Sequence, residues 1–225
     1  LAGLHAQLFE GLQLRAADSV QPRGTAPTNV VVVGIDDRSL ADLGQPWPWP
    51  RSTHAQLIDD LHDAGADVIA IDVLYAPASE CDDELAAAID RAGTVLLAEV
   101  VRIDGKTDRD LLVAGYVSPP ASTLADEALA VAQVAVLPDR DDGVVRRVPL
   151  LVDDGRNLLP ALSLVAVAAT TGSASGAPVV HSDGVQLGQR TIPTDCDTSM
   201  VVSYAPELSS ATAPNVVSAI DVLNG

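Results

Sequence analysis

The sequence has few basic residues. Its 225 residues include 13 lysines and arginines against 31 aspartates and glutamates, which gives a formal net charge of −18 at pH 7. A chain with this charge repels the phosphates of nucleic acids and the headgroups of anionic membrane surfaces. We therefore expect no nucleic acid partner.

A long hydrophobic run is also missing. A helix needs roughly 20 apolar residues to cross a bilayer, and the longest candidate, Leu158–Ala169, is interrupted by Pro160 and Ser163. The sequence therefore predicts no membrane span within these residues. At 48% hydrophobic residues the composition is nevertheless far from that of a disordered chain, so we expect one large folded domain or one domain with an extension.

Cysteine is scarce, since the chain contains only Cys81 and Cys196. Both lie among acidic residues, whose charge disfavours the formation of a reactive thiolate. Neither spacing resembles a zinc site, and we predict no metal ligands and no cofactor. A disulfide between the two cysteines is one alternative and two free thiols are the other, and the sequence leaves both open.

A repeated strand–helix pattern occupies the first hundred residues. Three apolar runs without polar alternation, Val30–Ile35, Val68–Leu74 and Val95–Val101, are typical of parallel strands buried on both faces. Between them the spacing predicts helices at Ser52–Ala64 and Asp82–Ala92, each followed by glycine. This order predicts an α/β fold in three layers, with a mostly parallel doubly wound sheet and helices on both faces.

The rest of the chain is less regular. We expect a helix that starts at Pro119-Pro120 and runs to Ala132. Short strands near Val185–Leu187, Thr191–Ile192 and Val201–Tyr204 follow a loop rich in glycine and serine. The C-terminal part is therefore predicted to be more irregular and to contain antiparallel strands.

The first residues show a helical stripe that begins apolar and then fades, formed by Leu1, Leu4, Leu8, Gly11 and Arg15. A membrane-proximal or dimerising helix has this pattern. An amphipathic helix that packs on the domain is the alternative. We accordingly divide the chain into a helix with its linker at 1–24 and a main domain at 25–225.

Acidic residues follow two of the predicted strands. Asp36 and Asp37 end the first strand, and Asp72 ends the second. Because the carboxyl ends of strands in an open α/β sheet border the ligand crevice, we expect these carboxylates to meet at a binding site. Neighbouring residues of a strand point to opposite sides, so one of the first two enters the crevice and the other caps a short helix at Arg38–Leu43.

Between these strands, a stiff segment of alternating tryptophan and proline leads to two further candidates, Arg51 and His54. A buried carboxylate needs a partner, and a salt bridge from Arg51 to an aspartate at either strand end is the structural interpretation. A bound ligand is the functional one. Trp47 and Trp49 either cover the end of the sheet or line a pocket. The ligand-binding candidates are Asp36, Asp37, Asp72, Arg51, His54 and Trp49.

A second charged cluster is predicted around Arg146 and Arg147. Neighbouring strand residues point to opposite faces, so one of the two arginines faces the interior. An inward arginine needs an acidic partner, and the aspartates of the preceding turn, Asp139–Gly143, supply it. We interpret this cluster as architecture.

Taken in order, these features resemble the second type of CHASE domain, the cyclase/histidine-kinase-associated sensory extracellular domain. The resemblance spans about Asp18 to Gly225. It is carried by Val33–Leu40, Trp47–Arg51 with His54, Ala64–Ala66, Ile71–Leu74, Asp83–Ala86, Asp141–Arg147, Ser163 with Leu164, and Asp221–Gly225.

The resemblance implies an extracytoplasmic sensory domain at 25–225, held at the cell membrane by flanking transmembrane helices. It would relay the state of an unknown small ligand or periplasmic partner to an intracellular effector. Twelve arginines against one lysine suggest a GC-rich bacterial genome and favour a nucleotide cyclase, with a kinase or diguanylate cyclase as the other choices. A homodimer is expected, and no catalytic residue is implied for this chain.

Two other functions remain open at this stage. Paired acids at strand ends also hold Mg²⁺ in phosphoryl-transfer enzymes and in phosphoacceptor receiver domains. Such a receiver needs a lysine at the crevice, and the only lysine, Lys106, lies in a polar loop. The other alternative is a constitutive dimerisation or scaffold domain without a ligand.

Overall fold

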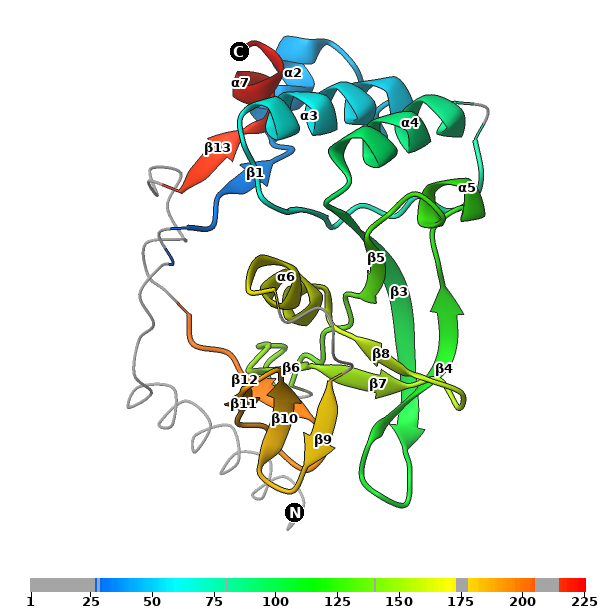
Figure 1. The fold of residues 1–225 in the computed structure, drawn as a ribbon, viewed down its shortest axis with the longest axis vertical. Coiled ribbons are helices and arrows are strands. Elements are labelled where there is room, and N and C mark those ends of the chain that lie inside the picture. The colour runs from blue at the N-terminus through cyan, green and yellow to red at the C-terminus, as the bar shows by residue number, and fades with distance from the viewer. Residues whose placement is uncertain (1–26, 28, 80, 140, 173–177, 205–214) are drawn as a thin grey trace.

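The computed structural model describes residue 27 and residues 29–79, 81–139, 141–172, 178–204 and 215–225. The helix and linker predicted at 1–24 lie outside these residues. Figure 1 shows a molecule with most of its helices at one end and small antiparallel sheets at the other. Within the described part, no helix combines the length and the apolar character needed to cross a bilayer.

A long strand, β3 (Val95–Lys106), forms the centre of a six-stranded sheet. Its first half pairs in parallel with β2 (Ile69–Ile71) along one edge and with β5 (Ala130–Gln133) along the other. This parallel half corresponds to two of the predicted strands. It places the carboxyl ends of β2 and β5 alongside the middle of β3.

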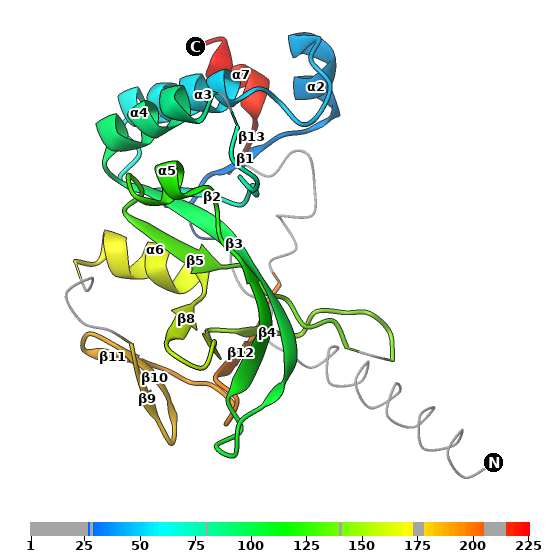
Figure 2. The ribbon, with the colours of Figure 1, turned by 90° about the vertical axis from the view of Figure 1, so that its right-hand side faces the viewer.

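The second half of the sheet is mostly antiparallel. Here β3 pairs antiparallel with β4 (Leu112–Ser118). The antiparallel hairpin of β7 (Leu151–Asp153) and β8 (Leu158–Pro160) continues the sheet beyond β4, which β7 meets in parallel at a single residue pair. Figure 2 shows how strongly β3 and β4 curve along this part. The sheet is therefore mixed, with a parallel end near the helices and a mostly antiparallel end far from them.

Helices cover both faces of the parallel end. α3 (Arg51–Asp63) and α4 (Asp82–Ala92) pack on each other over one face, and α6 (Leu162–Thr170) contacts β3 and β5 from the other face (Figure 2). The first turn of α4 carries three acids at the positive end of the helix dipole, and Gly93 adopts the left-handed conformation (φ 65°) that ends it. The predicted three-layer α/β class is confirmed.

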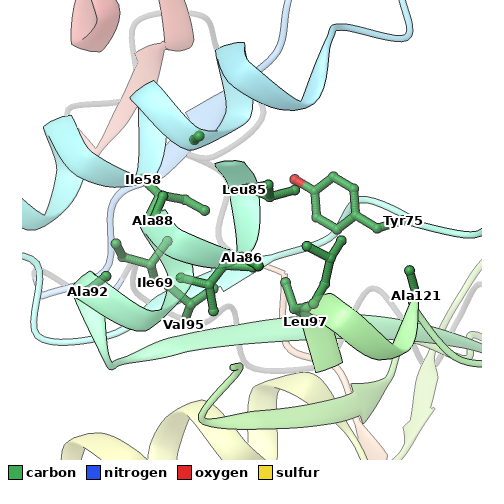
Figure 3. Close-up of a cluster of buried hydrophobic side chains, with 13 residues drawn as sticks. Ile58, Ile69, Tyr75, Leu85, Ala86, Ala88, Ala92, Val95, Leu97 and Ala121 are labelled. Carbon is green, nitrogen blue, oxygen red and sulfur yellow. The ribbon is translucent and has the colours of Figure 1, made fainter. Parts of the chain in front are cut away.

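The main hydrophobic core lies between α3, α4 and the sheet. Leu85, Ile89, Val95 and Leu97 are completely buried there, and Figure 3 shows the ring of Tyr75 beside Leu85 at one end of the cluster. These side chains come from the amphipathic faces of the helices and from both strands of the predicted β2–α4–β3 unit. The core is thus built from the elements with the clearest sequence pattern.

The helix predicted up to Ala132 is wrong. α5 (Ser122–Ala125) is only one turn long, and the alanine- and valine-rich segment after it forms β5. The reason is tertiary: Leu129 donates its N–H to the carbonyl of Val95 at 2.8 Å, which starts the ladder with β3. Hydrogen bonding to the edge of β3 outweighs the helical propensity of alanine here.

The first predicted strand is displaced from the sheet. β1 (Val32–Gly34) pairs in parallel with β13 (Val216–Ser218), and within the described part it has no ladder with β2. The prediction that Val30–Ile35 is buried on both faces is wrong, since Val31 is 59% exposed. With one neighbouring strand instead of two, β1 leaves its other edge open.

Two short helices complete this displaced unit. α2 (Asp37–Leu43) follows β1, and α7 (Ala219–Leu223) follows β13, so that the two strands and two helices form a unit which we call the terminal module. α7 also contacts α3, which joins the module to the rest of the molecule. Figure 1 shows the module at the helical end, with the C-terminus on α7.

The C-terminal part contains small antiparallel sheets, as predicted. β10 (Gly184–Leu187) lies between β9 (Val179–His181) and β11 (Arg190–Ile192), and β12 (Ser199–Val201) pairs with β6 (Arg147–Pro149). Val185 and Leu187 of β10 pack with α6 and β7 in a second hydrophobic core. This region lies far from the predicted site.

Candidate functional site

An apolar groove lies between the open edge of β1 and the open edge of β2. Its volume is about 720 Å³. Six residues of the β1 segment line one side, and β2 with the segments that flank it lines the other. The groove is lined by Asn29, Val30, Val31, Val32, Val33, Ile35, Leu40, Trp47, Val68, Ala70, Asp72, Ala166 and Thr170.

Backbone groups on both sides of the groove lack strand partners within the described part. In a parallel pair, one residue directs its N–H and C=O to the neighbouring strand and the next directs both away. Val32 donates to Asn215 at 2.8 Å and Ile69 donates to Thr94 at 3.1 Å. The polar backbone groups of Val33 and Ala70 are therefore on the open edges, and both residues line the groove.

A smaller polar pocket of about 320 Å³ adjoins the groove, since Trp47 and Asp72 line both. Four of the six predicted ligand-binding candidates lie in its wall. The pocket is lined by Trp47, Pro48, Trp49, Arg51, His54, Asp72, Val73 and Leu74. The N-terminus of α3 and the carboxyl end of β2 are thus brought together, as expected from the sequence.

Aromatic rings form the back of the polar pocket. The His54 ring lies edge-on to Tyr75, with ring centroids 5.4 Å apart, and the two tryptophan rings are 6.2 Å apart. Trp49 is buried with 3% of its surface exposed, whereas Trp47 is 47% exposed. Trp49 therefore both covers the core and lines the pocket. Trp47 presents its ring at the junction with the groove.

Two buried polar atoms in this cluster have no hydrogen-bond partner among the described residues, Nε1 of Trp49 and the hydroxyl of Tyr75. Burial raises the pKa of Tyr75 far above its usual value, so this hydroxyl keeps its proton. Unpaired donors in a buried cluster are costly. Tyr75 was missed in the sequence, although it directly follows the predicted strand.

Arg51 does not pair with Asp36 or Asp72, and that prediction is wrong. Its Nε donates to Oδ1 of Asp82 at 2.8 Å, and its guanidinium lies 4.6 Å from the centre of the Tyr75 ring. Asp82 is the first residue of α4 and also accepts from the N–H of Ser79 at 2.7 Å. The packing of α3 on α4 brings this carboxylate closer to Arg51 than either strand end, a contact that sequence spacing alone does not reveal.

His54 is neutral at physiological pH. Burial, and then the positive charge of Arg51, lower its pKa to about 4. The side chain lies inside the first turn of α3, with its ring against those of Trp47 and Trp49. It therefore contributes an uncharged imidazole to the polar pocket.

Asp36 does not reach either cavity. Its Oδ1 accepts from the backbone N–H and the hydroxyl of Ser39 and from the hydroxyl of Ser218, at 2.7–2.8 Å. These hydrogen bonds, with Ser39 first, lower the pKa of Asp36 to about 2. Asp36 is thus the N-cap of α2 and holds β13 to β1, while Asp37 is exposed in the first turn of the helix.

The three aspartates therefore do not converge as expected, and Asp72 alone remains at the cavities. Its carboxylate is exposed and has no hydrogen bond or ion pair with another residue of the described part. In the same part of the chain, no group of three or more histidine, cysteine, aspartate or glutamate side chains is arranged to hold a metal ion.

The second predicted cluster is confirmed. Nη1 of Arg146 lies 2.8 Å from a carboxylate oxygen of Asp139, and Nη2 lies 2.8 Å from one of Asp142. This buried arginine fixes the turn before β6 and lies away from the cavities. The two cysteines, Cys81 and Cys196, are free and exposed.

Comparison with protein families decides the assignment. The model of the CHASE2 domain matches residues 1–224. The chain belongs to the CHASE2 domain family. CHASE2 domains are extracellular sensory domains of signalling proteins and are not catalytic themselves. Comparisons with curated proteins and with solved structures gave no match. The resemblance found in the sequence is therefore confirmed.

Proposed function

We propose that this CHASE2 domain is the extracytoplasmic sensor of a bacterial transmembrane receptor and that the apolar groove with its polar pocket is the sensory site. Ligand at this site changes how the terminal module sits against β2, and flanking membrane helices pass the change to an intracellular effector. The observation that supports this proposal is the position of the groove, between the terminal module and the main sheet.

The terminal module is suited to such a relay because its parts are joined to one another. Arg38 of α2 donates to Asp221 of α7 at 2.8 Å, and the hydroxyl of Ser39 lies 2.8 Å from that of Ser218. The first and last described elements both belong to the module, so chain segments on either side of the domain connect through it. A tenfold shift between two arrangements requires only about 1.4 kcal/mol of differential binding.

The effector we favour is a nucleotide cyclase, because the arginine-rich composition suggests a GC-rich bacterial genome. A histidine kinase or a diguanylate cyclase is the alternative. Each would make the parent protein an enzyme while this domain only senses. Assays for cyclic nucleotide, phosphohistidine and cyclic dinucleotide formation by the parent receptor distinguish the three.

The test is effector activity of the parent receptor in membranes. We expect Asp72→Asn, which removes the carboxylate between the two cavities, and Ala70→Leu, which fills the groove, to change basal or stimulated activity. Asp67→Asn is the matched control, because this exposed acid precedes β2 and lines neither cavity. Unchanged activity in both site variants, with normal folding by circular dichroism, would remove the groove from signalling.

A homodimer whose interface includes β1 is a second candidate role for this region. The observation that favours it is the exposure of three successive valines, Val30, Val31 and Val32. Sedimentation of the wild type and of Val31→Asp tests this role. If the domain is a constitutive dimer, the wild type should sediment as a dimer and Val31→Asp as a monomer. A monomer at all concentrations argues against the scaffold role.

The structure offers less to a phosphoryl-transfer enzyme. Such a site needs paired acids. Asp36 is held in the terminal module by its hydrogen bonds with Ser39 and Ser218, whereas Asp72 lines the groove. The two carboxylates are therefore not paired. Calorimetric titration of the domain with Mg²⁺ and Mn²⁺ gives the direct answer. Micromolar binding would favour the enzyme.

A further inference from the structure

The charges around the polar pocket leave one carboxylate unbalanced. Of the residues that the structure describes, three ionisable side chains line it: Arg51, His54 and Asp72. Arg51 is neutralised by Asp82, whose side chain is 4% exposed, and His54 is uncharged at pH 7. Asp72 remains as a negative charge without a partner in the described part of the chain. The complementary ligand group is therefore a cation.

The aromatic surface next to Asp72 favours the same charge. Trp47 lines both cavities and exposes about half of its surface, so its ring is accessible at the junction where Asp72 lies. An organic cation over the face of a tryptophan ring is attracted by the ring quadrupole. The net charge of −18 further concentrates cations, and repels anions, near the domain.

The groove on the other side of this junction needs an apolar occupant. Valines of the β1 segment form one wall, and Val68, Ala70 and Ala166 face them. Among the described residues that line the groove, Asp72, which it shares with the polar pocket, is the only charged one. Its volume of about 720 Å³ falls in the usual range for small-molecule sites, roughly 300–1,000 Å³.

We infer that the two cavities form one site for an amphipathic organic cation, with its ammonium group between Asp72 and Trp47 and its hydrocarbon chain in the apolar groove. This inference rests on the proposed function, because it names the ligand class of the same sensory site. It assigns one role to three features that are otherwise unrelated: the unbalanced carboxylate, the exposed indole and the valine-lined groove.

The probe that tests it is n-hexylamine, which is a cation at pH 7, titrated into the purified 225-residue chain. The chain contains only two tryptophans, so the variant Trp49→Phe leaves Trp47 as the sole indole at the proposed site. We expect a saturable change in its emission, with calorimetry giving the affinity in the wild type. Hexanoate and 1-hexanol have the same chain length without the positive charge, and hexanoate should bind at least about fivefold more weakly.

Two variants test the carboxylate and the apolar groove separately. Asp72→Asn should weaken hexylammonium binding by about fivefold to tenfold. From butyl- to octylammonium, each added methylene should strengthen binding by about fourfold in the wild type, and Ala70→Leu should remove this gain by filling the groove. Asp67→Asn is the matched control and should bind like the wild type.

The inference is overturned if no alkylammonium binds saturably, if hexanoate binds as well as hexylamine, or if Asp72→Asn binds like Asp67→Asn. The proposed function fails in a different assay. If the amines do not bind but Asp72→Asn still alters effector activity in the parent receptor, the site senses a ligand of another class. If the amines bind as expected but Asp72→Asn leaves effector activity unchanged, the cation site exists without a sensory role.

Discussion

The central strand β3 and the displaced strand β1 differ sharply in burial. Around β3, apolar residues such as Val95 and Leu97 are completely buried between helices and neighbouring strands, whereas Val31 before β1 is 59% exposed. Both segments are apolar runs without polar alternation. The comparison teaches that such a run predicts a strand but not the number of other strands with which it will pair.

The difference follows from pairing. β3 has ladders on both edges and a helix layer on each face, while β1 pairs only with β13 within the described residues. Apolar area removed from water stabilises by roughly 25 cal/mol per Å². We therefore expect the buried core to carry most of the stability of the domain and the exposed valines of the groove to contribute little to it. The predictions below test this division.

The largest effect is expected in the core. Leu85→Ala removes a completely buried side chain between α3, α4 and Tyr75, and should lower the free energy of unfolding by about 3 kcal/mol. Val31→Ala, in the groove wall, should change it by less than about 0.5 kcal/mol. Urea unfolding measures both. Comparable losses for the two variants would show that β1 is part of the core.

The ion pair at the base of the polar pocket should come next. Asp82→Asn leaves the guanidinium of Arg51, whose side chain is 15% exposed, without its counter-charge, which should cost about 2 kcal/mol. Asp83→Asn is the control, because Asp83 is exposed in the same turn of α4. If Asp82→Asn is as stable as the control, the pair does not anchor the pocket wall.

Acid should lower the free energy of unfolding of the domain through the protonation of His54. Its pKa is 6.5 in the unfolded chain and about 4 in the folded domain. Between pH 4 and pH 6.5, His54 is therefore protonated in the unfolded state but neutral in the folded state. The stabilising contribution is complete above pH 6.5 and is lost as the pH falls towards 4, amounting to about 1–2 kcal/mol after allowance for solvent screening.

His54→Phe keeps an aromatic ring against Tyr75 and should reduce this pH dependence, while His62→Asn, at an exposed position of the same helix, should keep it. Denaturant unfolding at pH 7 and pH 4.5 gives the comparison. Equal slopes with pH in the wild type and in His54→Phe would contradict a buried neutral imidazole.

The smallest effect should be confined to the terminal module. Asp36→Ala removes the N-cap of α2 and the link to Ser218, so amide hydrogen exchange should accelerate in α2 and β13 while α4 keeps its protection. Asp37→Ala should leave exchange unchanged. Acceleration spread over the whole domain would mean that the module and the core do not behave as separate units.

Local sequence signals predicted most of the core. α4 matches the expected range, because its acidic first turn and the glycine after it define both ends without reference to the rest of the chain. The pairing of Arg146 with the preceding turn was also predictable, since its partners, Asp139 and Asp142, lie within seven residues. The fold class and the family follow from such features.

Long-range pairings could not be predicted in the same way. The partner of β1 is β13, 184 residues further along the chain by its register (Val32 with Val216), and nothing near β1 indicates it. Arg51 prefers Asp82 because α3 packs on α4, and Asp36 is committed to Ser218 because β13 lies beside β1. The sequence thus indicated the strand end that borders the two cavities, but which candidate residues line them depended on tertiary contacts.

Residue-resolved amide hydrogen exchange of the native domain tests the separation of β1 from β2 most directly. The account predicts fast exchange for the amides of Val33 and Ala70, which face the groove, and protection for Val32 and Ile69, which donate to Asn215 and Thr94. Equal protection of all four amides would mean that β1 and β2 pair in one continuous sheet, and that the groove does not exist.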